Sequence, residues 1–167
     1  RSANLSGSIP NSINFAANLS YIFLDDNNLT GIPETLEGLT NLRELHLHNN
    51  NIYGQIPADI GRLTNLEVLS LFNNQIFGLI PGSIGNLSHL SVLSLFNNQM
   101  SGVIPEGICN ISGYIILDNN YFCPPYPTCL DENYIGYQNT LECCPNIAGD
   151  INNDNSLDLL DIILIIN

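Results

Sequence analysis

Leucine and other apolar residues recur along most of this chain in one fixed arrangement. The two clearest copies are LEVLSLFNNQI over residues 66–76 and LSVLSLFNNQM over residues 90–100. In each copy the leucines of an L-x-L triplet alternate with a polar or small residue. Because alternate side chains of a β-strand point to opposite faces, each triplet predicts a short strand with its leucines turned toward a core.

An asparagine closes every copy, and these asparagines keep a nearly constant spacing. The steps between them are 23, 24, 24 and 22 residues, and the residues are Asn27, Asn50, Asn74, Asn98 and Asn120. Prolines follow nearly the same step at Pro10, Pro33, Pro57, Pro81 and Pro105. This L-x-x-L-x-L-x-x-N-x-φ pattern, where φ is apolar, resembles that of leucine-rich repeats. No single copy can bury its own leucines, so the copies are expected to stack and share one core.

The closing asparagines are interpreted as structural residues. At the end of a strand the side-chain amide can satisfy peptide groups that would otherwise be buried without partners. Buried polar groups are normally present because they are paired, so a ladder of such asparagines needs no separate binding role.

The segment that follows each asparagine narrows the class of repeat. The sequences GQIP over 54–57, GLIP over 78–81 and GVIP over 102–105 resemble the plant-type class of leucine-rich repeats. This class includes plant receptor-kinase ectodomains and polygalacturonase-inhibiting proteins, and it occurs in some bacterial surface proteins. The resemblance covers roughly residues 3–122. It implies an α/β solenoid, which is a right-handed superhelix with a parallel concave sheet, a second short strand after each glycine, and short helical turns on the convex side.

The second repeat departs from this pattern. Its segment Thr30-Gly31-Ile32-Pro33 lacks the residue that elsewhere stands between glycine and isoleucine. We expect this deletion to distort the second strand locally. The first repeat is also incomplete, since Asn4-Leu5 corresponds to Asn51-Ile52 and the strand half is missing. We interpret the chain as a fragment, a processed product, or a chain whose first repeat is completed by something else.

Composition divides the chain into three parts and limits its partners. Residues 1–122 carry the repeats, residues 123–147 carry most of the cysteines, and residues 148–167 form an acidic and then apolar tail. The net charge is −13, from 16 acidic residues and three arginines with no lysine. Nucleic acid and anionic membranes require a basic face, so both are disfavoured as partners. No signal peptide is visible, and no apolar run reaches the roughly 18–20 residues of a membrane span.

All five cysteines lie near the end of the array, at Cys109, Cys123, Cys129, Cys143 and Cys144. The cluster indicates a disulfide-bonded terminal cap and an oxidising, extracellular setting. The segment Cys123–Cys129 resembles the C-terminal cysteine cap of extracellular leucine-rich repeat proteins. With that resemblance we expect Cys109 to pair with Cys123, and Cys129 with Cys143 or Cys144, although spacing alone leaves the connectivity open. A zinc cluster is the disfavoured alternative, because no C-x-x-C pairs or nearby histidines are present.

The tail contains a candidate calcium loop. Side-chain oxygens fall at loop positions 1, 3, 5, 9 and 12, and with Ser156 at position 7 the predicted ligands are Asp150, Asn152, Asp154, Ser156, Asp158 and Asp161. Together with the following apolar residues the segment resembles a single dockerin-type repeat, a half-dockerin, which implies one structural Ca²⁺ and a short helix. An acidic turn without metal is the alternative.

Five N-x-S/T sequons are candidate glycosylation sites, at Asn4, Asn18, Asn28, Asn86 and Asn110. The motif N-L-S/T is also part of the repeat pattern itself. The motif alone therefore does not indicate glycosylation. Glycans are expected only if the source is a eukaryote.

Solvent-facing strand positions provide the candidate binding surface. They form three columns that begin at Tyr21, Phe23 and Asp25, and many of their members are apolar although the fold does not require it. Exposed apolar patches mark interaction sites. The residues expected to contact a partner are Tyr21, Phe23, His46, His48, Val68, Phe72, Val92, Phe96, Tyr114 and Ile116. Simple cross-strand stabilisation is the alternative.

Two chemical roles are weighed for the same strands and disfavoured. Glu44, His46 and His48 share one face and could hold a metal weakly. His46 and Ser70 are expected to be cross-strand neighbours, but a nucleophile also needs an oriented base and an oxyanion site in a pocket that excludes water. An open sheet offers neither, so no catalytic residue is assigned.

The sequence therefore predicts a non-catalytic, extracellular or cell-surface binding module. Its concave face would take a protein, or a polysaccharide, while the calcium-loaded tail orders the C-terminus. The structural alternative is a subunit that associates with itself end to end. Heterologous contacts of this kind that do not close generate a fibre. Inhibition of a secreted glycosidase is a minor alternative that rests only on likeness to the polygalacturonase inhibitors. Ice binding is weaker still, because the exposed columns lack a regular threonine array.

Overall fold

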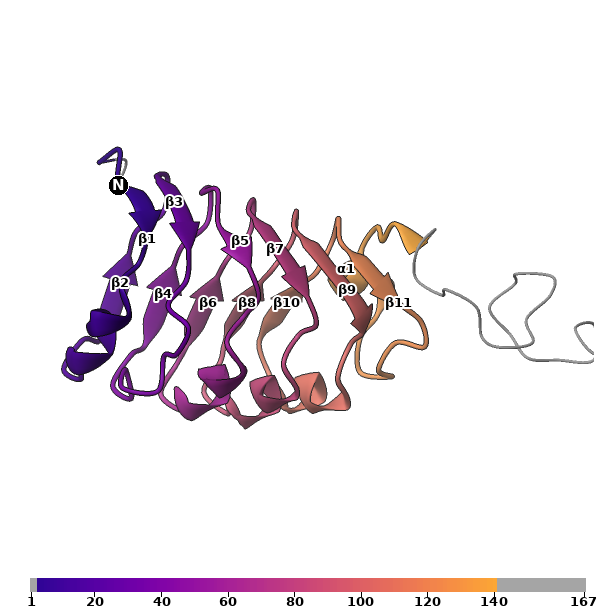
Figure 1. Ribbon diagram of the computed structural model, residues 1–167. Coiled ribbons are helices and arrows are strands. Elements are labelled where there is room, and N and C mark those ends of the chain that lie inside the picture. The colour runs from indigo at the N-terminus through magenta and orange to yellow at the C-terminus, as the bar shows by residue number, and fades with distance from the viewer. Residues whose placement is uncertain (1–2, 141–167) are drawn as a thin grey trace, which may run out of the picture.

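The computed structural model describes residues 3–140, which form an open spiral of stacked repeats (Figure 1). Each repeat contributes one strand to a main sheet, which corresponds to the expected concave sheet, and most contribute a strand to a second sheet. Short 3₁₀ turns follow the prolines on the convex side, at η1 (Asn11–Phe15), η2 (Ala58–Arg62), η3 (Gly82–Asn86) and η4 (Glu106–Asn110). The expected solenoid architecture is confirmed.

The main sheet has five parallel strands in the order in which they occur along the chain. They are β2 (Tyr21–Phe23), β4 (Glu44–His46), β6 (Val68–Ser70), β8 (Val92–Ser94) and β10 (Tyr114–Ile116). The central residue of each strand is buried, as the L-x-L pattern predicts, and these residues are Ile22, Leu45, Leu69, Leu93 and Ile115. They belong to one continuous hydrophobic core that runs the length of the array.

The second sheet is interrupted. Four parallel strands are paired in sequence, β5 (Tyr53–Gly54), β7 (Gln75–Gly78), β9 (Gln99–Val103) and β11 (Tyr121–Cys123), whereas β1 (Ser6–Ser8) pairs only with β3 (Asn28–Gly31). The break between β3 and β5 coincides with the residue that is missing after Gly31. The local distortion expected from this deletion is therefore present.

The asparagine ladder has the structural role expected from the sequence. The Asn98 side-chain nitrogen donates to the carbonyl oxygens of Leu71 and Leu95, each at 3.0 Å, and its Oδ1 accepts from the Ile76 backbone nitrogen at 3.0 Å. Asn50, Asn74 and Asn120 make the corresponding set of bonds, each with its own and the preceding repeat. Each asparagine thus joins two successive repeats.

Replacing Asn98 with alanine is expected to lower the free energy of unfolding by about 2–4 kcal/mol. The substitution leaves two buried carbonyls and one buried N–H without their partner, and each unsatisfied group costs about 1–3 kcal/mol before relaxation. Urea denaturation followed by circular dichroism measures the change. Gln99→Ala, at the exposed next position, is the matched control, with an expected change within about 0.5 kcal/mol. Equal effects of the two substitutions would contradict the ladder's role.

The disulfide in the cap differs from the expected pairing. Cys109 bonds to Cys129, with the two Cα atoms 5.7 Å apart. The predicted pairings of Cys109 with Cys123, and of Cys129 with Cys143 or Cys144, were therefore wrong. Cys109 is exposed in η4, whereas Cys123 is buried at the end of β11. The chain after β11 instead brings Cys129 beside η4. Cys143 and Cys144 lie outside the described residues.

A truncated additional repeat follows the last regular one, and it was not predicted. Helix α1 (Glu132–Ile135) is capped by Asp131, whose carboxylate accepts from the backbone nitrogens of Asn133 and Tyr134. Within the helix, the Tyr134 carbonyl accepts from the Leu117 backbone nitrogen at 3.0 Å. The Gln138 side chain accepts from the Phe122 nitrogen and donates to the Leu117 oxygen. Gln138 thus takes the position that asparagine has in the other repeats.

A candidate binding surface on the main sheet

The register of the main sheet places the predicted columns side by side. Tyr21, Glu44, Val68, Val92 and Tyr114 are successive partners, as are Phe23, His46, Ser70, Ser94 and Ile116. This grouping follows directly from the two-residue period of a strand. Six of the predicted partner-binding residues also contact one another through their rings.

These six residues form what is here named the aromatic row: Tyr21, Phe23, His46, His48, Phe72 and Phe96. The ring centroids are 6.2 Å apart for Tyr21 and Phe23, 4.8 Å for Phe23 and His46, and 5.9 Å for His46 and His48. The row continues at 4.4 Å from His48 to Phe72 and at 4.4 Å from Phe72 to Phe96. It therefore crosses four repeats diagonally without a break.

The ring planes decide what the row can bind. His48 and Phe72 are inclined by 13°, and Phe72 and Phe96 by 9°, so both faces of the Phe72 ring are covered by its neighbours. A sugar or a cation would need an uncovered ring face, whereas apolar side chains pack well against ring edges. The middle of the row is thus suited to apolar side chains of a polypeptide.

Acidic groups accompany the row. Glu44 Oε2 lies 2.9 Å from His46 Nε2, and Asp25 Oδ2 lies 3.8 Å from His48 Nε2. Phe23, Asp25, His46 and His48 line a shallow pocket of about 370 Å³. A ligand in this pocket would meet both ring surface and a carboxylate.

His48 is held by its surroundings rather than left free to rotate. The Ser70 hydroxyl lies 3.0 Å from His48 Nδ1, and Asp25 lies on the side of Nε2. Burial lowers the pKa of His48 below its ordinary value of 6.5, although the nearby carboxylates of Asp25 and Asp26 oppose the shift and His46 adds to it. The neutral ring is therefore favoured.

This pKa shift predicts that acid destabilises the fold through His48. Because the folded pKa lies below the unfolded value of about 6.5, the stabilisation is fully present above pH 6.5 and is lost as pH falls through the folded pKa. Urea denaturation at pH 7.5 and at pH 5 measures the loss. His48→Phe, which keeps the ring stack, is expected to remove this part of the pH dependence. An NMR titration midpoint of the His48 ring above 6.5 would contradict the assignment.

The contact between serine and histidine bears on the disfavoured hydrolase role. His46 and Ser70 are register partners as expected, but His48 is the ring that contacts the Ser70 hydroxyl. Ser70 is only 5% exposed, and the 3.8 Å from Asp25 to His48 Nε2 exceeds a hydrogen bond. The arrangement therefore explains how the His48 ring is positioned. Within residues 3–140, no group of three histidine, cysteine or acidic side chains is placed to hold a metal ion.

The remaining predicted site residues fall into three groups. Val68 and Val92 are half-buried beside the row, while Tyr114 and Ile116 are exposed on β10 at the far end of the sheet. All five sequon asparagines are exposed, and their glycosylation stays a prediction. The candidate calcium ligands, residues 150–161, lie outside the described residues. Among the helices of the described part, none is long and apolar enough to cross a membrane.

Comparison with known proteins identifies the class. A family model described as "Leucine Rich repeats (2 copies)" matches residues 17–61, and one described as "Leucine Rich Repeat" matches residues 65–87 and 89–111. A chain in the crystal structure of the BIR3–SERK2 complex from Arabidopsis thaliana is 33% identical, with a TM-score of 0.63, and the match covers 77% of this chain and 70% of that one. The chain belongs to the leucine-rich repeat family.

Its relatives include plant receptors. A probable leucine-rich repeat receptor-like serine/threonine-protein kinase from Arabidopsis thaliana is 44% identical over 54 residues, which are 32% of this chain and 6% of that protein. The plant peptide hormone receptor RGFR1 in complex with RGF2 is 34% identical, with a TM-score of 0.70, over 74% of this chain and 20% of the receptor chain. The ectodomain of the Arabidopsis thaliana receptor kinase GASSHO1/SCHENGEN3, in complex with CASPARIAN STRIP INTEGRITY FACTOR 2, is 36% identical, with a TM-score of 0.69, over 71% and 15%. The chain thus spans a fifth or less of these relatives.

Proposed function

We propose that the chain is a non-catalytic, extracellular binding module whose aromatic row takes a segment of a partner polypeptide. The observation that carries the proposal is the unbroken contact of six rings across the main sheet. Phe23 is 53% exposed and Tyr21 is 51% exposed, so one end of the row is open to a partner. Clustered aromatic side chains are the residues that most often dominate binding energy at interfaces.

The chemistry of the surface indicates which side chains the partner presents. Apolar side chains would pack on the ring edges of Phe72 and Phe96, and a lysine or arginine would lie beside Asp25 or Glu44. The net charge of −13 favours the same basic partner by steering its approach. Covered ring faces in the middle of the row make a polysaccharide the weaker candidate.

Several of the similar structures support a polypeptide partner. RGFR1 was solved with RGF2, and the Arabidopsis thaliana receptor HAESA was solved in complex with the peptide hormone IDA and the co-receptor SERK1. In both structures the receptor is in complex with a polypeptide. The Cys109–Cys129 disulfide favours an oxidising, extracellular location.

A peptide-display selection tests the proposal. Random peptides displayed on phage are selected against the immobilised chain, and the bound sequences are read. We expect enrichment of peptides that combine aromatic or aliphatic residues with lysine or arginine. In NMR spectra of the ¹⁵N-labelled chain, synthetic copies of these peptides should shift the amide signals of Phe23, His48 and Phe72. Selected peptides that shift only signals far from the main sheet would show that the aromatic row is not the binding surface.

A further inference from the structure

The break in the second sheet leaves one position uncovered. In the regular repeats the residue after glycine covers the glycine of the next repeat. Gln55 lies over Gly78, 3.2 Å from where a Cβ would stand, and Leu79 lies over Gly102. In the second repeat Ile32 follows Gly31 directly, so no side chain is available to cover Gly54. A Cβ built on Gly54 would meet nothing within 4 Å.

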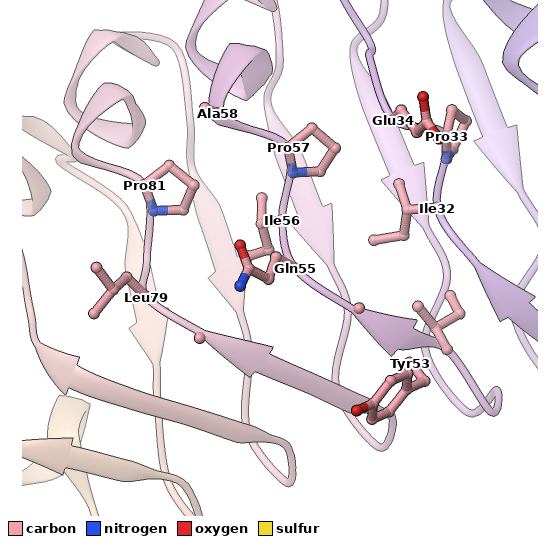
Figure 2. Close-up of a pocket in the computed structure, with 13 residues that line it drawn as sticks. Ile32, Pro33, Glu34, Tyr53, Gln55, Ile56, Pro57, Ala58, Leu79 and Pro81 are labelled. Atoms are coloured by element: carbon pink, nitrogen blue, oxygen red, sulfur yellow. The ribbon is translucent and has the colours of Figure 1, made fainter.

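A groove of about 570 Å³ lies at this place, as Figure 2 shows. Its walls come from three successive repeats and include Ile32, Pro33, Tyr53, Leu79 and Pro81. Tyr53 is 64% exposed and Leu79 is 60% exposed. Large apolar side chains that are exposed together mark an interaction site. The Phe77 ring supports Tyr53 at a centroid distance of 4.8 Å.

The strand pairing beside this groove is interrupted. Strand β5 is paired with β7 on one side, and on its other side it lies beside β3 without a ladder between them. Hydrogen bonds between these two repeats flank the interruption: the Asn51 nitrogen donates to the Leu29 oxygen at 2.9 Å before it, and the Leu36 nitrogen donates to the Asp59 carboxylate at 3.1 Å after it. Because β3 already lies beside β5, a ligand would occupy the space over Gly54 with a side chain rather than add a strand to the sheet.

We propose that this groove forms a second binding site, which takes an extended segment of a partner protein. One aliphatic side chain of that segment fills the space over Gly54 that the deleted residue leaves open. A flanking lysine or arginine lies beside Glu34, the single charged residue among those that line the groove within the described part of the chain. The net charge of −13 favours a basic segment in the same way. This site lies on the second sheet and is independent of the aromatic row.

The test uses a defined probe, an acetylated and amidated heptapeptide of alternating valine and threonine with leucine at its centre and lysine at both ends. Added to the ¹⁵N-labelled chain, it is expected to shift the amide signals of Tyr53, Gly54 and Leu79. A charge-reversed heptapeptide, with glutamate at both ends, should bind at least about tenfold more weakly. A loss of this size is what we expect when one flanking charge pair is lost. No shift at millimolar probe, or shifts confined to the main sheet, would overturn the proposal.

Two variants localise the binding. Insertion of leucine between Gly31 and Ile32 restores the regular G-x-I-P segment and is expected to abolish the shifts, because the new side chain covers Gly54. Leu79→Ser, at an exposed position that does not endanger folding, should weaken the heptapeptide by about tenfold. Phe72→Asp, in the aromatic row, should leave heptapeptide affinity unchanged, so failure of one site is distinguishable from failure of the other. Unchanged affinity in both groove variants would overturn the proposal.

Discussion

Removing the disulfide between Cys109 and Cys129 is expected to lower the free energy of unfolding by about 3 kcal/mol. The bond closes a loop between residues 20 positions apart. The loss of chain entropy in the unfolded state for a loop of that length corresponds to about 3 kcal/mol at 25 °C. The cap that this bond ties to η4 also covers the edge of β10, since Tyr134 accepts from the Leu117 nitrogen.

Single and double variants distinguish this bond from the pairing expected from the sequence. Cys109→Ser, Cys129→Ser and the double variant should be equally destabilised in urea denaturation without reductant, because each breaks the same bond. Thr128→Ser, at the exposed neighbouring position, is the control and should change stability by less than about 0.5 kcal/mol. Hydrogen exchange should increase first at the amides of Leu117 and Asn119. A double variant clearly less stable than either single one would show that the two cysteines have separate partners.

The repeat array could be predicted because its pattern encodes the structure directly. Two leucines separated by one residue define which side chains of a strand are buried, and the constant step between asparagines defines which strands are neighbours. Those two facts place Tyr21 beside Glu44 and Phe72 beside Phe96 before any coordinates exist. The missing residue after Gly31 was equally visible, and its consequence, a broken second sheet, follows from the same register.

The cap could not be predicted in the same way. Gln138 acts as a ladder residue only 18 positions after Asn120, in a segment without an L-x-L triplet, so neither spacing nor residue type indicated it. The signal that could have identified it is an amide side chain shortly after the apolar pair Tyr134 and Ile135. The cysteine pairing failed for a related reason. The likeness to the cysteine cap of extracellular leucine-rich repeat proteins favoured Cys123, whereas the structure buries Cys123 in β11 and joins the exposed Cys109 and Cys129.

The chemistry of the main sheet was only partly accessible from the sequence. The column positions of His46, His48 and Ser70 were correct, but side-chain directions decide which groups touch. His48 turns its Nδ1 toward Ser70 in the next repeat, because its other nitrogen faces Asp25 in the previous one. The stacking of His48 on Phe72 and Phe96 likewise depends on ring orientation, which a pattern of residue types does not specify. This orientation is what covers the ring faces and favours a polypeptide over a sugar.

Replacing Phe72 with aspartate is expected to weaken the binding of peptides selected on the wild-type chain by about a hundredfold, or roughly 3 kcal/mol. Phe72 contacts both His48 and Phe96, so the change interrupts the aromatic row at its centre and places a charge among the remaining rings. Because the residue follows β6 and is only half-buried, the hydrophobic core of the repeats is not altered. Isothermal titration calorimetry with the selected peptides measures the loss.

Two further variants separate contact from charge in this experiment. Phe72→Leu keeps an apolar side chain but removes the ring stack, and we expect a loss of about tenfold. Phe77→Leu, a change of the same kind on the second sheet, should leave the affinity of these peptides unchanged. Circular dichroism and urea midpoints of Phe72→Asp, Phe72→Leu and Phe77→Leu test whether the repeats remain folded, and we expect that they do. If Phe72→Asp binds the selected peptides as well as the wild-type chain does, the contacts of the aromatic row stabilise only the sheet itself, and recognition belongs to another surface of the solenoid.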